Sequence, residues 1–251
     1  MTNTIVDIHR MSRRSYGSPR VHAELRLGAG IRCSRKRVER LMRQAGVAGI
    51  YRRRGRGWTR RDPQAILNDD LVGRQFDPPG PDRLWFMDVT EHPTGEGKLY
   101  LAVVLDAFSR RVVGWSITDH IHSELVVDSL QMAIGVANHP EVRSSPTRIT
   151  ARRPIESGEF TAWAFTRRAQ ESGLVASMGS IGDCFDNAVI ESFWGRMQVE
   201  LLKRRKWKTR IELANAIFEY LEIFHNRQRR HSSLGMLTPI EYENLDRVTV
   251  A

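Results

Sequence analysis

Cysteine is scarce in this sequence, with two residues among 251, Cys33 and Cys184. They lie far apart and belong to no Cys-x-x-Cys or mixed Cys/His array, so the sequence predicts neither a structural zinc site nor a disulfide framework. Long apolar runs are also lacking, because no stretch approaches the roughly 18 residues that a membrane span requires. The N-terminus lacks the apolar core of a signal peptide. We therefore expect a cytoplasmic, nucleoid-associated protein with no membrane partner.

Acidic residues are nearly absent from the first part of the chain. Residues 1–61 contain 17 Lys and Arg but only three acids, Asp7, Glu24 and Glu39, which gives a net charge of +14. The whole chain carries +10, so the remaining 190 residues carry −4. A basic module joined to a mildly acidic body is typical of a nucleic-acid-binding domain attached to a second domain.

Two short amphipathic patterns occupy the basic module. One spans residues 18–27 and begins with Ser18 and Pro19, which suit a helix start, and the other opens at Ser34 and ends at Gly46. The glycine-containing turn between them predicts a helix-turn-helix whose second helix enters a major groove. A helical hairpin with a merely solvated basic face is the alternative. The residues expected to bind DNA on the second helix are Arg35, Lys36, Arg37 and Arg40.

Two further basic stretches are predicted to contact phosphates. The first is a flexible linker that includes Arg52, Arg53 and Arg54. The second is a turn near the C-terminus that includes Arg227, Arg229 and Arg230, flanked by two histidines. A separate nuclease site built on these histidines is the alternative, and clustered basic residues after a helix favour phosphate contacts.

One carboxylate stands inside an otherwise apolar strand pattern. The bulky residues 84–87 precede Asp88, and apolar runs at 99–105 and 112–117 follow after turns. This order predicts three antiparallel strands followed by a helix over residues 123–134. A buried carboxylate costs several kcal/mol unless it is paired or bound to metal. Pairing with an arginine or capping of a turn is therefore the alternative to a metal ligand.

The second half of the chain predicts further core elements. A helix from Phe160 to about Ser172, a short strand at 174–178 and a long helix from Asn187 to about Leu202 follow one another. On the long helix, Glu191 and Trp194 lie three residues apart and so share a face. A final helix from Arg210 to His225 precedes a docking tail at 232–242. Carboxylates on a first strand and a late helix are what two-metal phosphoryl transfer requires.

Six stretches together resemble the OrfB-type transposases of bacterial insertion sequences (the IS-three group), relatives of retroviral integrases. They are SYGSPRVHAEL (15–25), SRKRVERLM (34–42), WFMDVT (85–90), YLAVVLDAFSRRVVGW (100–115), GSIGDCFDNAVIESFW (179–194) and HNRQRRHSSLGMLTPIEY (225–242). The resemblance implies an α/β fold: an RNase H-like integrase core with a mixed five-stranded sheet and helices, preceded by a small helix-turn-helix domain. The implied division is 1–61 helix-turn-helix and linker, 62–82 connector, 83–202 catalytic core and 203–251 C-terminal helix and tail.

The resemblance also implies the site. Asp88 is the first aspartate and Glu191 the closing glutamate of an Asp-Asp-Glu triad, both ligands of two Mg²⁺ or Mn²⁺ ions. Asp106, Asn187 and Trp194 match motif positions with structural or DNA-contacting roles. The family's second aspartate is missing: Ile155 stands where 35 residues would separate it from Glu191, and the nearest carboxylate, Glu156, is one residue off register.

The stretch 135–153 has no apolar run and does not predict a buried strand. One hypothesis is that it is translated out of frame, because codons read one nucleotide earlier permit His-Ser-Asp-His-Gly-Thr-Gln across residues 146–153. That reading places the restored aspartate about six residues too far from Glu191, and a divergent surface loop is the alternative. The nucleotide sequence of the gene decides between them.

The sequence thus predicts a DNA transposase that is impaired in catalysis because the second triad aspartate is absent. Its expected partners are double-stranded DNA at element ends and target, further copies of the chain, and the product of an upstream reading frame. A DNA-binding remnant without catalysis, competing with an intact transposase, is the alternative function.

Overall fold

The computed structural model describes residues 1–51, 78–137, 148–151, 167, 171, 175–178 and 188–250. The chain forms two compact units. One unit combines Met1–Arg54, Gly195–Arg205 and Glu219–Ala251, and the other combines Gly55–Trp194 and Lys206–Phe218. This grouping differs from the four consecutive segments that the sequence suggests, because the two ends of the chain share one unit.

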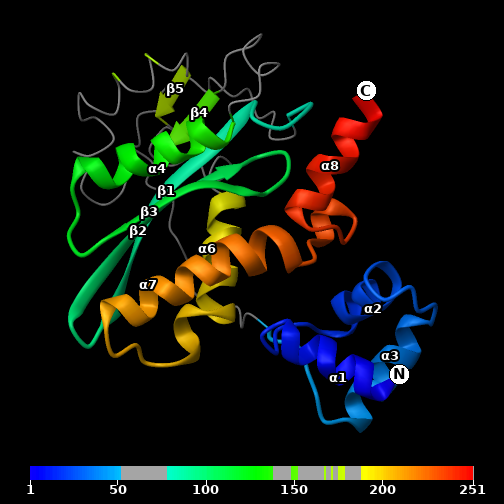
Figure 1. Cartoon of the computed structure of the whole chain (residues 1–251). Coiled ribbons are helices and arrows are strands. Elements are labelled where there is room, and N and C mark those ends of the chain that lie inside the picture. Colours follow the sequence, from blue (N-terminus) through cyan, green and yellow to red (C-terminus); the bar gives the residue numbers. More distant parts are fainter. Residues whose placement is uncertain are drawn as a thin grey trace, which may run out of the picture. The chain divides into compact units, whose positions relative to one another are not determined.

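A mixed five-stranded sheet in the order β3-β2-β1-β4-β5 forms the centre of the second unit (Figure 1). Strands β1 (Leu84–Thr94), β2 (Gly97–Asp106) and β3 (Val112–Thr118) are antiparallel, as predicted. The short strands β4 (Arg148–Ala151) and β5 (Val175–Met178) run parallel to β1. The predicted five-stranded sheet is confirmed.

Strand β4 corrects one expectation from the sequence. The stretch 135–153 does not predict a buried strand, yet β4 lies between β1 and β5 and pairs with both. Its register places Arg148 opposite Leu84 and Ala151 opposite Met87. A strand with neighbours on both sides is held by backbone hydrogen bonds, which do not require an apolar run. The helix predicted from Phe160 lies almost entirely outside the described residues.

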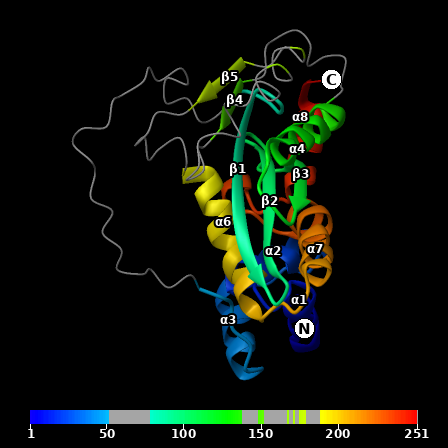
Figure 2. The same cartoon turned by 90° about the vertical axis from the view of Figure 1, so that its left-hand side faces the viewer.

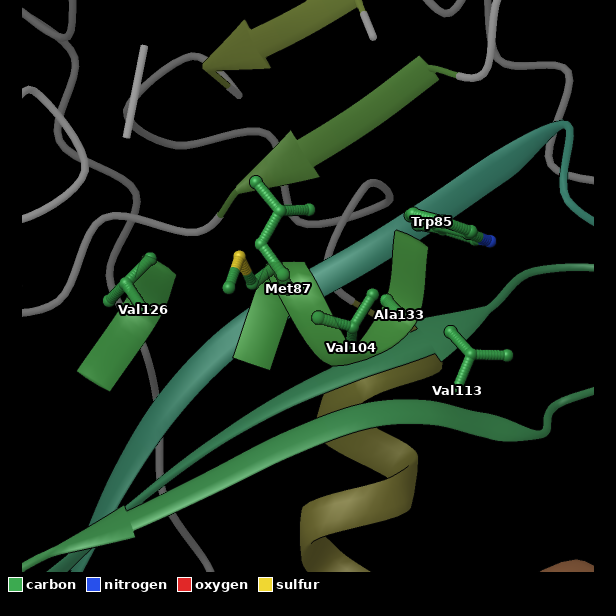
Figure 3. Packing of buried hydrophobic residues seen from close by; sticks show 7 residues of the cluster. Trp85, Met87, Val104, Val113, Val126 and Ala133 are labelled. Atoms are coloured by element: carbon green, nitrogen blue, oxygen red, sulfur yellow. The ribbon is translucent and has the colours of Figure 1, made fainter. Parts of the chain in front are cut away.

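The two faces of β1 pack against different helices, as the alternation of side chains along a strand requires. Trp85 and Met87 join Val104, Val126 and Ala133 in a buried cluster beneath helix α4 (Ser123–Val136) (Figure 3). On the opposite face, Leu84 and Phe86 pack with Ile190 of helix α6 (Ala188–Glu200). Figure 2 shows α4 and α6 on opposite sides of β1. Both helices were predicted.

The β1–β2 hairpin holds the start of helix α7 (Arg210–Phe218). The Arg210 backbone N–H donates to Glu96 Oε2 at 2.9 Å, and Arg210 Nε–H donates to the Lys98 carbonyl at 3.0 Å. A short turn of helix, η2 (Leu202–Arg204), precedes α7. The predicted helix from Arg210 continues beyond α7 as a π-helical segment, η3 (Glu219–Gln228), which belongs to the first unit.

Three helices begin the first unit: α1 (Thr2–Met11), α2 (Ser18–Leu27) and α3 (Arg35–Gln44). Ile5, Val21, Leu25 and Val38 are fully buried among them. Helices α2 and α3 confirm the predicted helix-turn-helix, whereas α1 was not predicted. The predicted docking tail forms η4 (Ser232–Leu234) and the start of α8 (Pro239–Val250). Within the described ranges, no helix is both long and apolar enough to span a bilayer.

Candidate active site and DNA-binding surface

Asp88 faces helix α6 because of its place in the alternation of β1. Leu84 and Phe86, four and two residues earlier, lie on the face of the sheet that packs against Ile190. Side chains two residues apart on a strand share a face, so Asp88 belongs to the same face. Its side chain is buried, with 6% of its surface exposed. The strand therefore carries a nearly buried carboxylate toward α6.

An indole N–H and a backbone N–H donate hydrogen bonds to this carboxylate. Trp194 Nε1–H, on α6, donates to Asp88 Oδ2 at 2.9 Å, and the Val89 backbone N–H donates to Asp88 Oδ1 at 3.0 Å. Trp194 lies 106 residues from Asp88 in sequence. A buried carboxylate needs such donors, and they fix its orientation. The Trp194 contact was not foreseen, although the sequence does place Trp194 on the same helix face as Glu191.

Glu191 lies in the first turn of α6, and its side chain is exposed. It lies three positions before Trp194, so the two side chains project from the same side of the helix. The hydrogen bond from Trp194 to Asp88 therefore ties the helix of Glu191 to the strand of Asp88. The structure thereby joins the elements that carry the two predicted triad residues.

The third predicted carboxylate, Glu156, lies outside the described residues, as does Asn187. Strand β4, which pairs directly with the strand of Asp88, contains no Asp or Glu in its four residues. In the part of the chain that the structure describes, no group of three or more His, Cys, Asp or Glu side chains could hold a metal ion. Asp88 and Glu191 are oxygen donors of the kind that Mg²⁺ and Mn²⁺ prefer, so the described residues fit two ligands of such a site.

Asp106 has a structural role at the end of β2. Its Oδ1 accepts from the backbone N–H and the hydroxyl of Ser109, at 2.7 and 2.9 Å, and its Oδ2 accepts from the Asp82 backbone N–H at 2.9 Å. Burial raises the pKa of Asp106 to about 7, against the hydrogen bonds from Ser109, and the nearby Asp82 charge adds to the rise. The carboxyl group therefore organises the β2–β3 turn.

Helix α3 presents the predicted basic surface. The Ser34 hydroxyl accepts from the Arg37 backbone N–H at 3.3 Å and so caps the helix, as its position in the sequence suggests. Val38 and Met42 are buried, whereas the predicted DNA-binding residues on this helix are all exposed: Arg35, Lys36, Arg37 and Arg40. The linker residues Arg52, Arg53 and Arg54 lie outside the described residues.

The prediction that the late basic turn binds DNA is wrong for Arg229 and Arg230. Their exposed fractions are 0% and 4%. The Arg229 guanidinium pairs with the buried carboxylate of Glu200, and the Arg230 guanidinium pairs with the partly exposed carboxylates of Glu24 and Glu241 in the same unit. Only Arg227 of the three is exposed. His225 and His231 are also buried, which leaves no open nuclease site at this turn. The sequence shows the charge of these residues but not their acidic partners.

Family comparisons match three stretches of the chain. Residues 1–55 match an HTH-like domain, and residues 78–184 and 172–239 match an integrase core domain. Among solved structures, the chain is similar to the HTLV-2 integrase catalytic core domain, with 17% identity and a TM-score of 0.46 over 65% of this chain and 97% of that one. A structural similarity of this size is too weak to inform the site.

Sequence alignments with known transposases cover nearly the whole chain. The transposase for insertion sequence element IS629 of Shigella sonnei is 33% identical over 236 residues, covering 94% of this chain and 76% of that protein. Transposase InsF for insertion sequence IS3A of Escherichia coli strain K12 is 32% identical over 233 residues, covering 93% and 78%. Identity and coverage at this level show that the chain belongs to the insertion-sequence transposases of the IS3 family.

Proposed function

We propose that the chain binds double-stranded DNA through the basic face of α3, and that Asp88 and Glu191 bind the divalent metal of a strand-cleavage and strand-transfer site. An integrase-type core implies divalent-metal dependence in general. The observation that carries the proposal is the hydrogen bond from Trp194 to Asp88, because it joins the strand and the helix that bear the two carboxylates.

The two carboxylates of the proposed site differ in their surroundings. Asp88 is buried and oriented by two donors, whereas Glu191 is open to solvent on the adjoining helix. When bound, two Mg²⁺ or Mn²⁺ ions supply the positive charge that activates the attacking oxygen and stabilises the leaving oxygen of a phosphodiester. In cleavage, water attacks phosphorus and the 3′-oxygen leaves as a hydroxyl group. In transfer, that 3′-hydroxyl attacks phosphorus in a phosphodiester of the target DNA and forms a new ester bond, while the target's own P–O3′ bond breaks and its 3′-oxygen leaves as a hydroxyl group with the proton.

We further propose that this copy is impaired in catalysis. Strand β4, beside Asp88, carries no carboxylate in its described residues, and Glu156 is one residue off the family register. With one of three carboxylates missing, two ions are held poorly. With Mn²⁺ and element-end DNA, the purified chain should therefore show no strand transfer. Efficient turnover would contradict the proposal of impairment.

Metal binding tests the site even when turnover is absent. Asp88→Asn and Glu191→Gln should each weaken Mn²⁺ binding more than about tenfold, measured by electron paramagnetic resonance, without changing DNA affinity. Glu124→Gln removes the same charge from an exposed position in the first turn of α4 and serves as the matched control. Equal Mn²⁺ binding by all three variants would mean that Asp88 and Glu191 do not form the metal site.

A non-catalytic competitor is the second candidate function, and the absence of a carboxylate from β4 favours it. Such a chain would occupy element-end DNA without cutting it. Adding it to an active relative should reduce strand transfer, and Asp88→Asn should inhibit to the same extent. If Asp88→Asn abolishes a metal-dependent nicking activity of the chain, the competitor role is excluded. Further copies of the chain and the upstream-frame product remain proposed partners.

A further inference from the structure

The N-terminal helices share their unit with the C-terminal segment, residues 219–251, and with the end of α6. A second set of side chains, remote in sequence from one another, joins these three parts. Its members come from the region of α2, from Glu200 at the end of α6, and from the turn after η3. None of them belongs to the proposed metal site or to the basic face of α3.

Glu200 lies at the centre of this set and is 4% exposed. Arg229 donates to both of its oxygens, from Nε to Oε2 and from Nη2 to Oε1, each at 2.8 Å. The Tyr220 hydroxyl donates to Oε2 at 2.9 Å, and Arg20 of α2 lies 3.7 Å from Oε1. Burial alone would raise the pKa of Glu200, but the hydrogen bonds and charge of Arg229 outweigh it and lower that pKa. Both oxygens of this buried carboxylate therefore accept hydrogen bonds from Arg229.

Arg230 makes the second connection. Its Nε–H donates to Glu24 Oε2 on α2, and its Nη1–H donates to Glu241 Oε2 on α8, both at 2.6 Å. Its backbone N–H donates to the Tyr16 hydroxyl at 2.7 Å, and that hydroxyl donates to the Gln228 carbonyl at 3.0 Å. One arginine thereby joins α2, the first helix of the helix-turn-helix, to α8, the last helix among the described residues.

The contacts on the N-terminal side follow a helical period. Arg20 and Glu24 are four residues apart on α2, so they lie along one side of that helix, and Tyr16 lies just before its N-cap, Gly17. The basic residues of α3 are all exposed. Among the described residues of this unit, the C-terminal segment thus docks on α2 and not on the basic face of α3.

We propose that the C-terminal segment is an integral part of the DNA-binding unit, in which Glu200, Arg229 and Arg230 are positioning residues for the helix-turn-helix. The N-terminal helices then reach full DNA affinity only when this segment is docked on α2. Undocking lowers the population of the binding-competent state, and apparent affinity falls in proportion. The proposal rests on the proposed binding of DNA by α3.

Two acidic residues of the helix-turn-helix give a matched test in the full chain. Glu24 accepts from Arg230, whereas Glu39 pairs with Arg43 of α3 at 3.3 Å, where both side chains are more than half exposed. Glu24→Gln and Glu39→Gln remove the same charge, and electrostatics alone would strengthen DNA binding in both. We expect Glu24→Gln instead to weaken binding and to speed amide hydrogen exchange in α2 about tenfold. Glu39→Gln should do neither.

Glu200→Gln should have the larger effect in both measurements, because it leaves the Arg229 charge buried with a neutral partner. Should this variant fail to fold, Glu24→Gln still decides the matter. The proposal would be overturned if amide exchange in α2 were the same in Glu24→Gln as in Glu39→Gln. It would also be overturned if Glu24→Gln showed faster exchange but bound a mixed-sequence duplex as tightly as the unchanged chain. The double variant Arg37→Ala/Arg40→Ala tests DNA binding by α3 separately from docking of the C-terminal segment. It should weaken DNA binding without altering amide exchange in α2. If DNA binding were undiminished, the proposal that α3 binds DNA would be refuted, whereas the docking of the C-terminal segment on α2 would still stand.

Discussion

The Asp88 carboxylate is oriented by the indole of Trp194, which lies on a helix distant from Asp88 in sequence. Trp194 Nε1–H contacts Oδ2, while the Trp194 ring packs edge-on against Phe193 with centroids 4.9 Å apart. The ring therefore has two separable roles, packing and hydrogen bonding. A partner that orients a metal ligand affects metal affinity by about tenfold to a hundredfold, even though it does not touch the metal.

Trp194→Phe should keep the packing and remove the donor. We expect Mn²⁺ binding to weaken about tenfold while the fold is retained, as measured by electron paramagnetic resonance and circular dichroism. Trp115→Phe is the matched control, because Trp115 packs edge-on against Phe218 in the same unit and removal of its indole leaves the Asp88 contact in place. Wild-type Mn²⁺ affinity in Trp194→Phe would show that the hydrogen bond does not position Asp88.

The sequence predicts the roles of some residues but not of others. Asp88 stands out because a carboxylate in an apolar strand needs a partner, and Glu191 because of its motif. Arg229 could not be assigned correctly, since its partner Glu200 lies 29 residues earlier and only the folded chain brings them together. A basic run looks the same in sequence whether it faces DNA or a buried glutamate.

Among the elements, α4 and β3 approach unusually closely at Gly114. A Cβ added there would lie 2.1 Å from the Ser129 carbonyl oxygen and 2.8 Å from the Ala133 backbone nitrogen, so the helix or the strand would have to shift. Both contacts are backbone atoms of α4 and cannot move independently of the helix. The glycine thus sets the distance between α4 and the sheet, whose facing side chains form the buried cluster of Figure 3.

Gly114→Ala should lower the free energy of unfolding by about 1–3 kcal/mol through overpacking. Gly135→Ala, within α4, is the matched control. Among the described residues, no atom beyond its chain neighbours and the backbone of its own helix lies within 4 Å of the added Cβ, and the better helix propensity of alanine should raise stability by up to about 1 kcal/mol. Urea denaturation followed by circular dichroism measures both. Equal stability of the two variants would contradict the close packing of α4 on β3.

The elements with regular side-chain periods were predictable from sequence. The apolar runs of β1, β2 and β3 and the helical spacing in α4 and α6 gave their types correctly. Helix α1 was missed, because only Ile5 and Ile8 of its apolar residues are buried and no capping residue marks its start. Strand β4 was missed because its four residues, Arg-Ile-Thr-Ala, include no apolar run and its pairing partners are distant in sequence.

At the scale of the whole molecule, the sequence suggested consecutive domains, whereas the chain forms two units from interleaved segments. Such grouping depends on contacts between residues separated by about 200 positions, for example Arg230 with Glu24, which carry no local signature. Among the described residues, each unit contains a buried group whose burial shifts its pKa: upward for Asp106 in the unit of the sheet, and downward for His231 in the unit of the helix-turn-helix.

These two groups make the stabilities of the units depend on pH in opposite directions. Burial raises the pKa of Asp106 from 3.8 to about 7, so its stabilising effect is complete below 3.8 and is lost as pH rises through about 7. Burial, aided by the charges of Arg229, Arg20 and Arg196 and by His225, lowers the pKa of His231 well below 6.5. Its stabilising effect is complete above 6.5 and is lost as pH falls toward the folded-state pKa.

Acidification from about pH 8 to about pH 5.5 should therefore strengthen the unit of the sheet and weaken the unit of the helix-turn-helix, each by roughly 1–2 kcal/mol. Native-state hydrogen exchange, corrected for the intrinsic pH dependence of exchange, can follow β2 and α2 separately in the intact chain. His231→Gln keeps an acceptor for Arg229 Nη1 but does not titrate, so it should remove the acid sensitivity of α2 and leave β2 unchanged. Parallel pH dependence of the two elements would contradict the assignment, because groups with raised and lowered pKa values must act with opposite sign.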